Sequence, residues 1–183
     1  MVSFAAPAPK PLPDVAIPTT KGQVITFKRY RGKVMIVALI STTCKKCLDT
    51  VQILEKMQAD LGPKGFQAVA AAIEPNAKFM VNGLINRYRL SYPVGYLEKD
   101  PAFKLAGLPA TGRPFVPIIL VVNRQGQLVL QLFGDSPLLK TEDNSLRGIV
   151  NNYLREGAAA APAQTKAPSP ETAPDSPPSP DKP

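Results

Sequence analysis

Both cysteines of this 183-residue chain lie close together, as Cys44 and Cys47, with Lys45 and Lys46 between them. An apolar run at 34–40 precedes the pair, and a segment with helical spacing of apolar residues follows it. A Cys-x-x-Cys pair at the point where a strand gives way to a helix is typical of thiol redox chemistry. The sequence therefore predicts Cys44 and Cys47 as a redox-active dithiol.

The amino-acid composition excludes several other kinds of active site. The chain has no histidine, which removes histidine-based acid/base catalysis, the serine-type triad and every histidine-containing metal site. A zinc ion takes about four ligands, and two cysteines supply only part of that set unless carboxylates or a second chain contribute. We therefore expect neither a bound metal nor a cofactor.

The charge and hydrophobicity are those of a globular chain with a basic folded region. Hydrophobic residues make up 44% and charged residues 20% of the sequence, and it contains no apolar run long enough to span a bilayer. The net charge is +8, although the segment from Gly157 onward holds two lysines against three acidic residues. Because no run of Lys and Arg exceeds two residues, we interpret the charge as an ordinary basic surface and expect no nucleic-acid partner.

Hydrophobic periodicity predicts the elements that must position the cysteines. Apolar runs predict buried strands, and apolar residues at helical spacing predict amphipathic helices. Strand, helix and strand in succession imply a parallel pair with a right-handed crossover, whereas a turn at 123–126 implies an antiparallel hairpin. In chain order we expect an opening hairpin at 15–17 and 24–27, strands at 34–40, 66–73, 117–122 and 127–133, and helices at 48–61, 76–88, 100–106 and 142–155.

Proline and alanine dominate both ends of the chain. Residues 1–13 predict an extended Pro/Ala-rich arm, because each proline fixes its own backbone and biases its predecessor away from helix. Residues 157–183, rich in proline, alanine and serine, cannot bury enough apolar area to fold, so we expect a disordered tail. Residues 14–156 remain as the single folded domain.

Several local motifs accompany this order of elements. They are the opening hairpin, Tyr30-Arg31-Gly32-Lys33-Val34, Cys44-Lys45-Lys46-Cys47, Val116-Pro117 and Asn123-Arg124-Gln125-Gly126. With them, the chain from about Leu12 to Arg155 resembles the thioredoxin-like superfamily, in its redoxin branch of TlpA- and ResA-like thiol-disulfide oxidoreductases related to the AhpC/TSA peroxiredoxins. The resemblance implies an α/β thioredoxin-like fold, with a central mixed sheet flanked by helices and an N-terminal β-hairpin.

The resemblance also implies a role for each residue of the site. Cys44 would be the exposed attacking thiol, Cys47 the buried resolving thiol, and Pro117 a cis proline packed beside the pair. A cis Val116–Pro117 bond would leave the backbone of Val116 facing the cysteines, where a bound partner chain could pair with it as an added strand.

Positive potential around Cys44 is expected from the helix and from the lysines. A helix N-terminus presents unpaired N–H groups that stabilise a thiolate, and Lys45 and Lys46 add positive charge. Because stabilising the thiolate favours the dithiol form, the lysines should shift the couple towards a more oxidising potential than uncharged residues would give.

Three positions depart from the pattern of these relatives. Thr43 replaces the tryptophan commonly found before the first cysteine. Ala38 stands where many thioredoxins have a buried carboxylate, and Thr50 stands where ResA-like proteins have one. Proton transfer to and from Cys47 therefore lacks its usual mediator, and a water molecule or a residue from elsewhere would have to serve.

A peroxiredoxin-like peroxidase is one alternative function. Cys44 would then be the peroxidatic thiol, and the hydroxyl of Ser41 would orient the peroxide. That family also has a proline at the position of Val37 and an arginine at the position of Pro117. Both are missing here, although Arg113 lies near enough in sequence to reach the site.

A non-catalytic thioredoxin-fold binding module is the other alternative, because the missing carboxylates permit it. In such a module the basic surface and the proline-rich ends would recruit a partner. A structural disulfide would be equally inert, and a copper chaperone of the redoxin class would be expected to carry a histidine.

The function predicted from these features is that of a thiol-disulfide oxidoreductase, which exchanges disulfides with protein substrates by Cys44 attack and Cys47 resolution. We expect a monomer that depends on an upstream redox donor or acceptor and has no integral membrane segment. Residues 2–6 resemble the end of a secretory signal, and proline-rich tails are common in exported bacterial proteins. The sequence therefore favours an extracytoplasmic, periplasmic location over a cytoplasmic one.

Overall fold

Strand β4 (Val34–Ile40) leads directly to the cysteines, and all seven of its residues are buried. It pairs in parallel with β5 (Phe66–Ala72) and antiparallel with β7 (Ile118–Val122). A strand that is covered on both faces has no solvent-facing positions, which explains why this run contains no polar side chain. The element that positions the cysteines is thus fixed on both edges and on both faces.

The computed structural model describes residues 9–109, 111, 115–139 and 142–159 of the chain. Its main sheet has six strands in the order β1-β8-β7-β4-β5-β6, and a second sheet pairs β2 with β3. The other strands are β1 (Lys10–Pro11), β2 (Ile17–Pro18), β3 (Val24–Ile25), β6 (Val94–Tyr96) and β8 (Gln127–Leu132). The α-helices are α1 (Lys45–Leu61), α2 (Ala77–Tyr88), α3 (Lys99–Ala106) and α4 (Glu142–Ala159), and the 3-10 helices are η1 (Phe27–Tyr30), η2 (Gly62–Lys64) and η3 (Pro137–Leu139).

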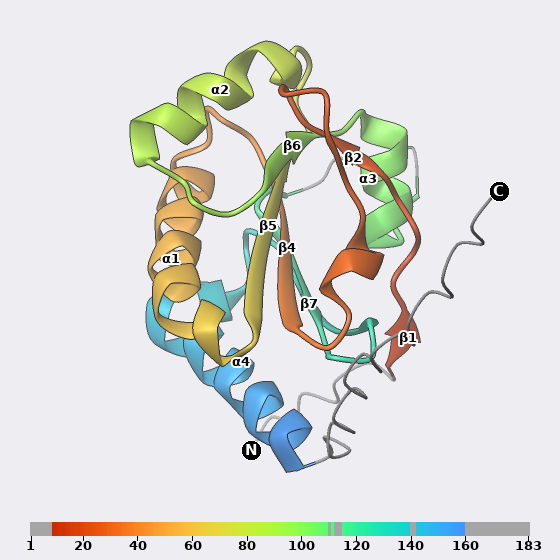
Figure 1. Ribbon diagram of the computed structural model, residues 1–183. Coiled ribbons are helices and arrows are strands. Elements are labelled where there is room, and N and C mark those ends of the chain that lie inside the picture. Colours follow the sequence, from red (N-terminus) through yellow and green to blue (C-terminus); the bar gives the residue numbers. More distant parts are fainter. Residues whose placement is uncertain (1–8, 110, 112–114, 140–141, 160–183) are drawn as a thin grey trace, which may run out of the picture.

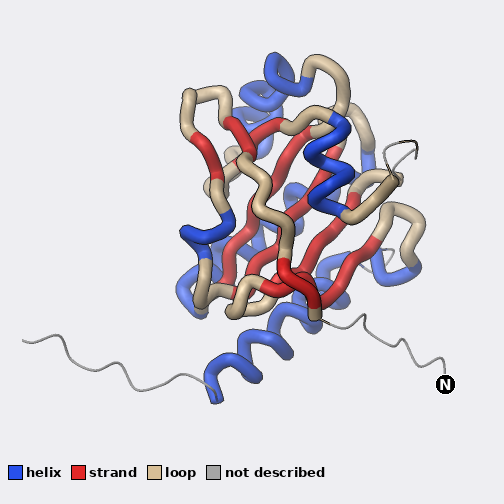
Figure 2. The backbone as a smooth tube through the Cα atoms, turned by 90° about the vertical axis from the view of Figure 1, so that its right-hand side faces the viewer, coloured by secondary structure: helices blue, strands red, loops and turns tan. Residues whose placement is uncertain are grey.

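Helices cover both faces of the main sheet (Figure 1). Helices α1, α2 and α4 pack on one face, and α3 packs on the other together with η1 and the β2-β3 hairpin, as Figure 2 shows from a second direction. Because successive side chains of a strand point to opposite faces, β4 contributes to both hydrophobic clusters. The cluster under α1 receives Val34, Ile36, Ala38 and Ile40, and the opposite cluster receives Met35, Val37 and Leu39.

The central mixed sheet, its flanking helices and the opening hairpin are confirmed, with differences at the element ends. Helix α1 begins at Lys45 rather than at 48. Helix α4 continues to Ala159 rather than ending at 155. Residues 1–8 of the predicted arm and 160–183 of the predicted tail lie outside the described residues.

Two short strands are absent from the sequence prediction. Strand β6 pairs in parallel with β5. Strand β1 lies within the segment predicted as an arm and pairs with β8, with Lys10 opposite Leu128. Alternation of apolar and polar residues becomes detectable only over about four residues or more, so strands of two or three residues cannot be predicted from it. Strand β1 can contain Pro11 because it lies at the edge of the sheet, where a missing backbone N–H leaves no ladder hydrogen bond unmade.

Gly95 of β6 allows the N-terminal hairpin to approach the sheet closely. A Cβ atom at this position would lie 2.4 Å from the carbonyl oxygen of Pro18 and 2.6 Å from Cγ2 of Ile17. Real side chains do not come this close, so β2 can rest on β6 only where the residue lacks a Cβ atom. The absence of a side chain at Gly95 therefore couples the hairpin to the main sheet.

We expect Gly95→Ala to lower the free energy of unfolding by about 1–3 kcal/mol, because the added methyl group overpacks this contact. Gly83→Ala is the matched control: a Cβ at Gly83, within α2, would meet nothing within 4 Å. That substitution should raise stability by about 1 kcal/mol, because alanine has the higher helix propensity. Urea unfolding measures both changes, and an unaltered stability of Gly95→Ala would contradict the close contact.

Candidate active site

Cys44 is the N-cap residue of α1. Its backbone is extended, with φ −81° and ψ 120°, and its carbonyl oxygen accepts the first helical hydrogen bond from the N–H of Leu48 at 3.0 Å. The first turn of α1 contains no acidic residue, so no carboxylate of that turn offsets the positive potential of its unpaired N–H groups. The partly exposed Cys44 thiol therefore lies at the positive end of the α1 dipole.

Cys47 lies one helical turn further along and faces the core. Its side chain is fully buried and belongs to the cluster that contains Val51 and Leu54. Burial strongly raises the pKa of the Cys47 thiol, a hydrogen bond from the backbone N–H of Ser41 opposes the shift, and the neighbouring Cys44 and the negative charge of Glu74 raise the pKa further. That N–H lies 3.4 Å from Cys47 Sγ. Cys47 is therefore a neutral thiol at neutral pH in the reduced protein.

The Val116–Pro117 peptide bond is cis, as the sequence predicts. The carbonyl oxygen of Val116 accepts a hydrogen bond from Cys44 Sγ at 3.9 Å. A segment distant in sequence, at the start of β7, thus brings its backbone to the attacking thiol. Pro117 itself is buried, whereas the preceding Phe115 is 68% exposed.

Gly134 supports this backbone and was not predicted as a site residue. A Cβ atom at Gly134 would lie 2.4 Å from the carbonyl oxygen of Val116, so only glycine lets the segment after β8 lie against it. Lys46 Nζ donates a hydrogen bond to the carbonyl oxygen of Gly134 at 2.9 Å. Lys46 therefore connects the start of α1 to the segment that packs on Val116.

The two lysines of the motif have different surroundings. Lys45 Nζ forms an ion pair with Asp49 Oδ2 at 2.9 Å, and both side chains are substantially exposed. Such a surface pair has little energetic weight, but the carboxylate partly offsets the positive charge near Cys44. The predicted effect of Lys45 and Lys46 on the reduction potential stays a prediction.

Glu74 is a second residue of the site that the sequence analysis missed. It lies two positions after β5, and its Oε1 accepts hydrogen bonds from both the backbone N–H of Thr42, at 2.7 Å, and the Thr42 hydroxyl. Its Oε2 is buried and has no hydrogen-bond partner among the described residues. An acidic residue just beyond a strand parallel to β4 was the available signal, since parallel strands end at the same edge of a sheet.

The positions that lack the expected carboxylates have ordinary structural surroundings. Ala38 is fully buried within β4. Thr50 is also buried, and its hydroxyl donates to the carbonyl oxygen of Lys46 one turn earlier, at 2.8 Å. Neither residue can accept a proton from Cys47, whereas Glu74 is a carboxylate whose negative charge acts on the buried thiol.

An open cavity of about 700 Å³ adjoins the site. Its lining includes Ser41, Glu74 and Val116 on the side of the cysteines and Phe79, Tyr96 and Phe103 further away. The side chain of Phe79 is 78% exposed. The reactive end of the sheet therefore continues into a largely apolar hollow between the segment that follows β5 and α3.

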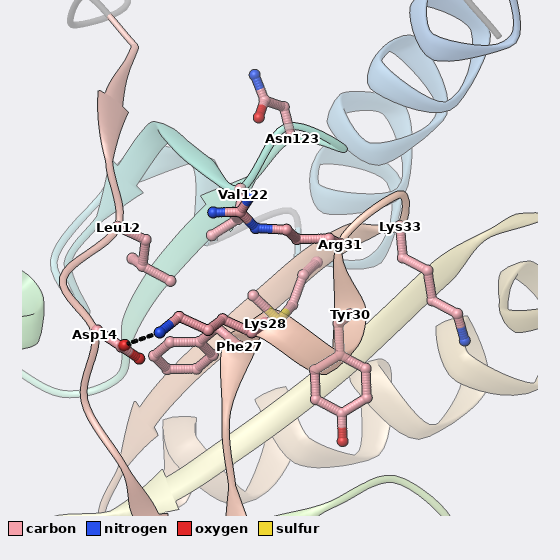
Figure 3. A pocket seen from close by; sticks show the side chains of 11 residues that line it. Leu12, Asp14, Phe27, Lys28, Tyr30, Arg31, Lys33, Val122 and Asn123 are labelled. Carbon is pink, nitrogen blue, oxygen red and sulfur yellow. Dashed lines mark ion pairs between the residues drawn. The ribbon is translucent and has the colours of Figure 1, made fainter. Parts of the chain in front are cut away.

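A smaller cavity, of about 150 Å³, lies at the other end of β4 (Figure 3). Met35 and Val122, which are paired in the sheet, contribute to its lining, as do the basic side chains Arg31 and Lys33. Its remaining base, Lys28, is paired with Asp14 at 2.7 Å. The length of β4 lies between this cavity and Cys44, so the cavity is not part of the dithiol site.

Other predicted features can be located only in part. Within the described ranges no group of three or more His, Cys, Asp and Glu residues is arranged to hold a metal ion. Among the same residues no helix is both long enough and apolar enough to cross a membrane. The position where a peroxiredoxin would have an arginine holds the cis Pro117, and Arg113 lies outside the described residues.

Solved structures share this architecture. A thiol:disulfide interchange protein of the thioredoxin family from Chlorobium tepidum superposes with a TM-score of 0.68 at 21% identity, over 82% of this chain and 99% of the other. A thiol:disulfide interchange protein from a Bacteroides species superposes with a TM-score of 0.64 at 17% identity, over 83% of this chain and 93% of the other. These similarities confirm the thioredoxin-like fold.

Comparison with protein families gives a more specific result than the fold. The Redoxin family model matches residues 7–133, a span that begins before β1 and ends just after β8. It therefore includes the Cys-x-x-Cys helix, Glu74 and the cis Val116–Pro117 bond, and it covers more than half of the sequence. The chain belongs to the Redoxin family.

Proposed function

We propose that this protein is a thiol-disulfide oxidoreductase that exchanges disulfides with protein substrates, with Cys44 as the attacking thiol and Cys47 as the resolving thiol. The observation that carries the proposal is the unequal placement of the two thiols on one helical turn. Cys44 is partly exposed at the helix N-terminus, and Cys47 is buried behind it. Such a pair suits a reaction in which one thiol meets the substrate and the other acts afterwards.

The first step needs an accessible thiolate. The N-terminus of α1 stabilises negative charge on Cys44, and the open cavity beside Ser41 and Val116 gives a substrate access to this end of the sheet. The Cys44 thiolate attacks one sulfur of a substrate disulfide. A mixed disulfide forms between Cys44 and the substrate, and the other substrate sulfur leaves as a thiolate.

The second step releases the substrate. Cys47 gives up its proton and attacks Cys44 Sγ, which forms the Cys44–Cys47 disulfide and expels the remaining substrate sulfur as a thiolate. The protein dithiol is oxidised by two electrons and the substrate disulfide is reduced by two. If an upstream oxidant supplies the protein with the Cys44–Cys47 disulfide, the same steps run in reverse, and a substrate dithiol is oxidised to a disulfide.

The surroundings of Cys44 favour a polypeptide as the substrate. The backbone of Val116 lies at the thiol, where an extended chain could pair with it. Phe115, which precedes Val116, exposes a large apolar surface, and so does Phe79, which lines the adjoining cavity. Burial of such side chains by apolar residues of a substrate supplies binding free energy that a small disulfide could not gain.

We expect Cys44→Ser to lower the rate of insulin disulfide reduction by at least a hundredfold, because the serine hydroxyl cannot attack a disulfide at neutral pH. Cys47→Ser should retain the first attack and accumulate a mixed disulfide, which non-reducing mass spectrometry would detect. The pair of variants differs only in which thiol is removed, so each is the control for the other. Unchanged exchange in Cys44→Ser would refute the proposed function.

We also expect the stability of the reduced protein to fall as the pH rises above about 9. Burial raises the pKa of Cys47 above its usual value, so the unfolded chain loses this proton at a pH where the folded chain keeps it. The stabilising contribution is fully present below the pKa of the unfolded thiol, near 8.5, and is lost as the pH rises towards the folded pKa.

The slope attributable to Cys47 is at most about 1.4 kcal/mol per pH unit. Denaturant unfolding of reduced wild type and of Cys47→Ala between pH 9 and 10.5 measures it, and the variant should show the shallower dependence. The buried Tyr92, whose pKa is also raised by burial, is present in both proteins and cancels in the comparison. Equal slopes would mean that Cys47 titrates normally in the folded state.

A further inference from the structure

We propose that Glu74 is the proton acceptor for Cys47 in the resolving step, taking over the function of the carboxylates that are missing at positions 38 and 50. This inference rests on the proposed function, because it concerns the second half of that reaction. It assigns a catalytic role to a residue outside the Cys-x-x-Cys motif and outside the family pattern on which the sequence analysis relied.

Two consecutive backbone N–H groups bind the thiol and the carboxylate, one each. The N–H of Ser41 donates to Cys47 Sγ at 3.4 Å, and the N–H of Thr42 donates to Glu74 Oε1 at 2.7 Å. The donors belong to adjacent residues, so the thiol and the carboxylate are both anchored to the same turn, and the negative charge of Glu74 acts on Cys47. The segment that follows β4 therefore holds both groups of the proposed proton transfer.

The two oxygens of Glu74 are not equivalent. Oε1 is held by the N–H and the hydroxyl of Thr42, which fixes the carboxylate in one orientation. Oε2 is buried without a hydrogen-bond partner among the described residues. A buried acceptor that is left unsatisfied is costly, and a carboxylate oxygen in this condition is poised to take a proton from a nearby donor such as the Cys47 thiol.

Charge conservation within the buried site favours this route. Loss of the Cys47 proton to solvent would leave two negative charges close together, on Cys47 and on Glu74, away from water. Transfer of the proton to Glu74 keeps the number of negative charges at one and moves that charge from oxygen to sulfur. The carboxylate, whose negative charge raises the pKa of Cys47, becomes neutral in the same step.

The order of the two half-reactions also helps. In the reduced protein Cys44 contributes to the raised pKa of Cys47. Once Cys44 has formed the mixed disulfide, its sulfur carries no charge, so that contribution disappears. Deprotonation of Cys47 therefore becomes easier after the substrate has been bound covalently, which is when the resolving thiolate is needed.

The proposed step balances in atoms and electrons. Glu74 Oε2 accepts the Cys47 proton, and the Cys47 thiolate forms a bond with Cys44 Sγ while the bond between Cys44 and the substrate sulfur breaks. The substrate sulfur leaves with the electron pair of that bond. It then takes the proton from Glu74, which restores the carboxylate; if it is protonated by solvent instead, Glu74 returns its proton to water.

The resolving step can be measured separately from the first attack. Reduced protein reacts at acid pH with dithiobis(nitrobenzoate), which forms the mixed disulfide between Cys44 and thionitrobenzoate and releases a second thionitrobenzoate. The released thiol is removed, and a jump to pH 7 then starts the attack by Cys47. The release of thionitrobenzoate is followed by its absorbance. In Glu74→Gln we expect release to slow at least tenfold, in keeping with the 10²–10⁴-fold typical of general base catalysis, while formation of the mixed disulfide stays unchanged.

The pH profile separates proton transfer from a structural role. Without the carboxylate, Cys47 must lose its proton to solvent species, so the rate in Glu74→Gln should rise with pH and approach the wild-type rate in alkaline solution. A deficit caused by a displaced loop would persist at every pH. Glu156→Gln is the control, because Glu156 is an exposed carboxylate of α4 outside the lining of the cavity that adjoins the site, and its release rate should equal that of wild type.

A second variant distinguishes the loss of proton transfer from the loss of the hydrogen bonds to Thr42. In Glu74→Ala the carboxylate is removed entirely, and added formate should restore thionitrobenzoate release in proportion to its concentration, whereas chloride at equal ionic strength should not. Wild-type release rates in Glu74→Gln at pH 7, or a deficit that neither pH nor formate relieves, would overturn the inference. Failure of the wild type to release thionitrobenzoate at all would instead overturn the proposed function.

Discussion

The parallel pairing of β4 with β5 is the constraint on which the site depends. The two strands run in register for seven consecutive pairs, ending with Ile40 opposite Ala72, so the segments that follow them leave the sheet at the same level. The N–H of Ile73 continues the pairing by donating to the carbonyl oxygen of Ile40 at 3.0 Å. The turn at 41–43 and Glu74 are neighbours for this reason, although thirty residues of chain separate them.

The packing of α1 on the sheet decides which thiol can meet a substrate. Alanines on the β5 surface that faces α1 leave room for a close approach of the helix. The apolar stripe of α1, with Val51 and Leu54, must face this surface, and Cys47 lies on the same stripe. Cys44, one turn earlier, caps the helix and stays partly exposed. The same burial that stabilises the domain therefore separates an attacking thiol from a protected one.

Local patterns predicted much of the fold and part of the site. The long apolar runs at 34–40 and 66–73 were sufficient, because seven or more residues show strand character clearly. The cis bond at Val116–Pro117 was expected from the resemblance to the redoxin branch, in which a cis proline precedes this strand of the hairpin. Glu74 and Gly134 were missed, because their importance depends on contacts between segments that are far apart in sequence. The spacing of residues in the sequence cannot show that a Cβ atom at Gly134 would collide with Val116.

The missing carboxylates show how a positional argument can mislead. Ala38 and Thr50 are two places from which a side chain can reach the second cysteine, one on β4 and one on α1. The end of β5 supplies a further position at the same edge of the sheet, and Glu74, whose charge acts on Cys47, follows that strand. Its carboxylate is oriented by Thr42, which belongs to the same turn that presents Ser41 to Cys47. The absence of an acid at a given position in sequence is therefore weak grounds for its absence from the site, because the sheet lets different segments supply the same group.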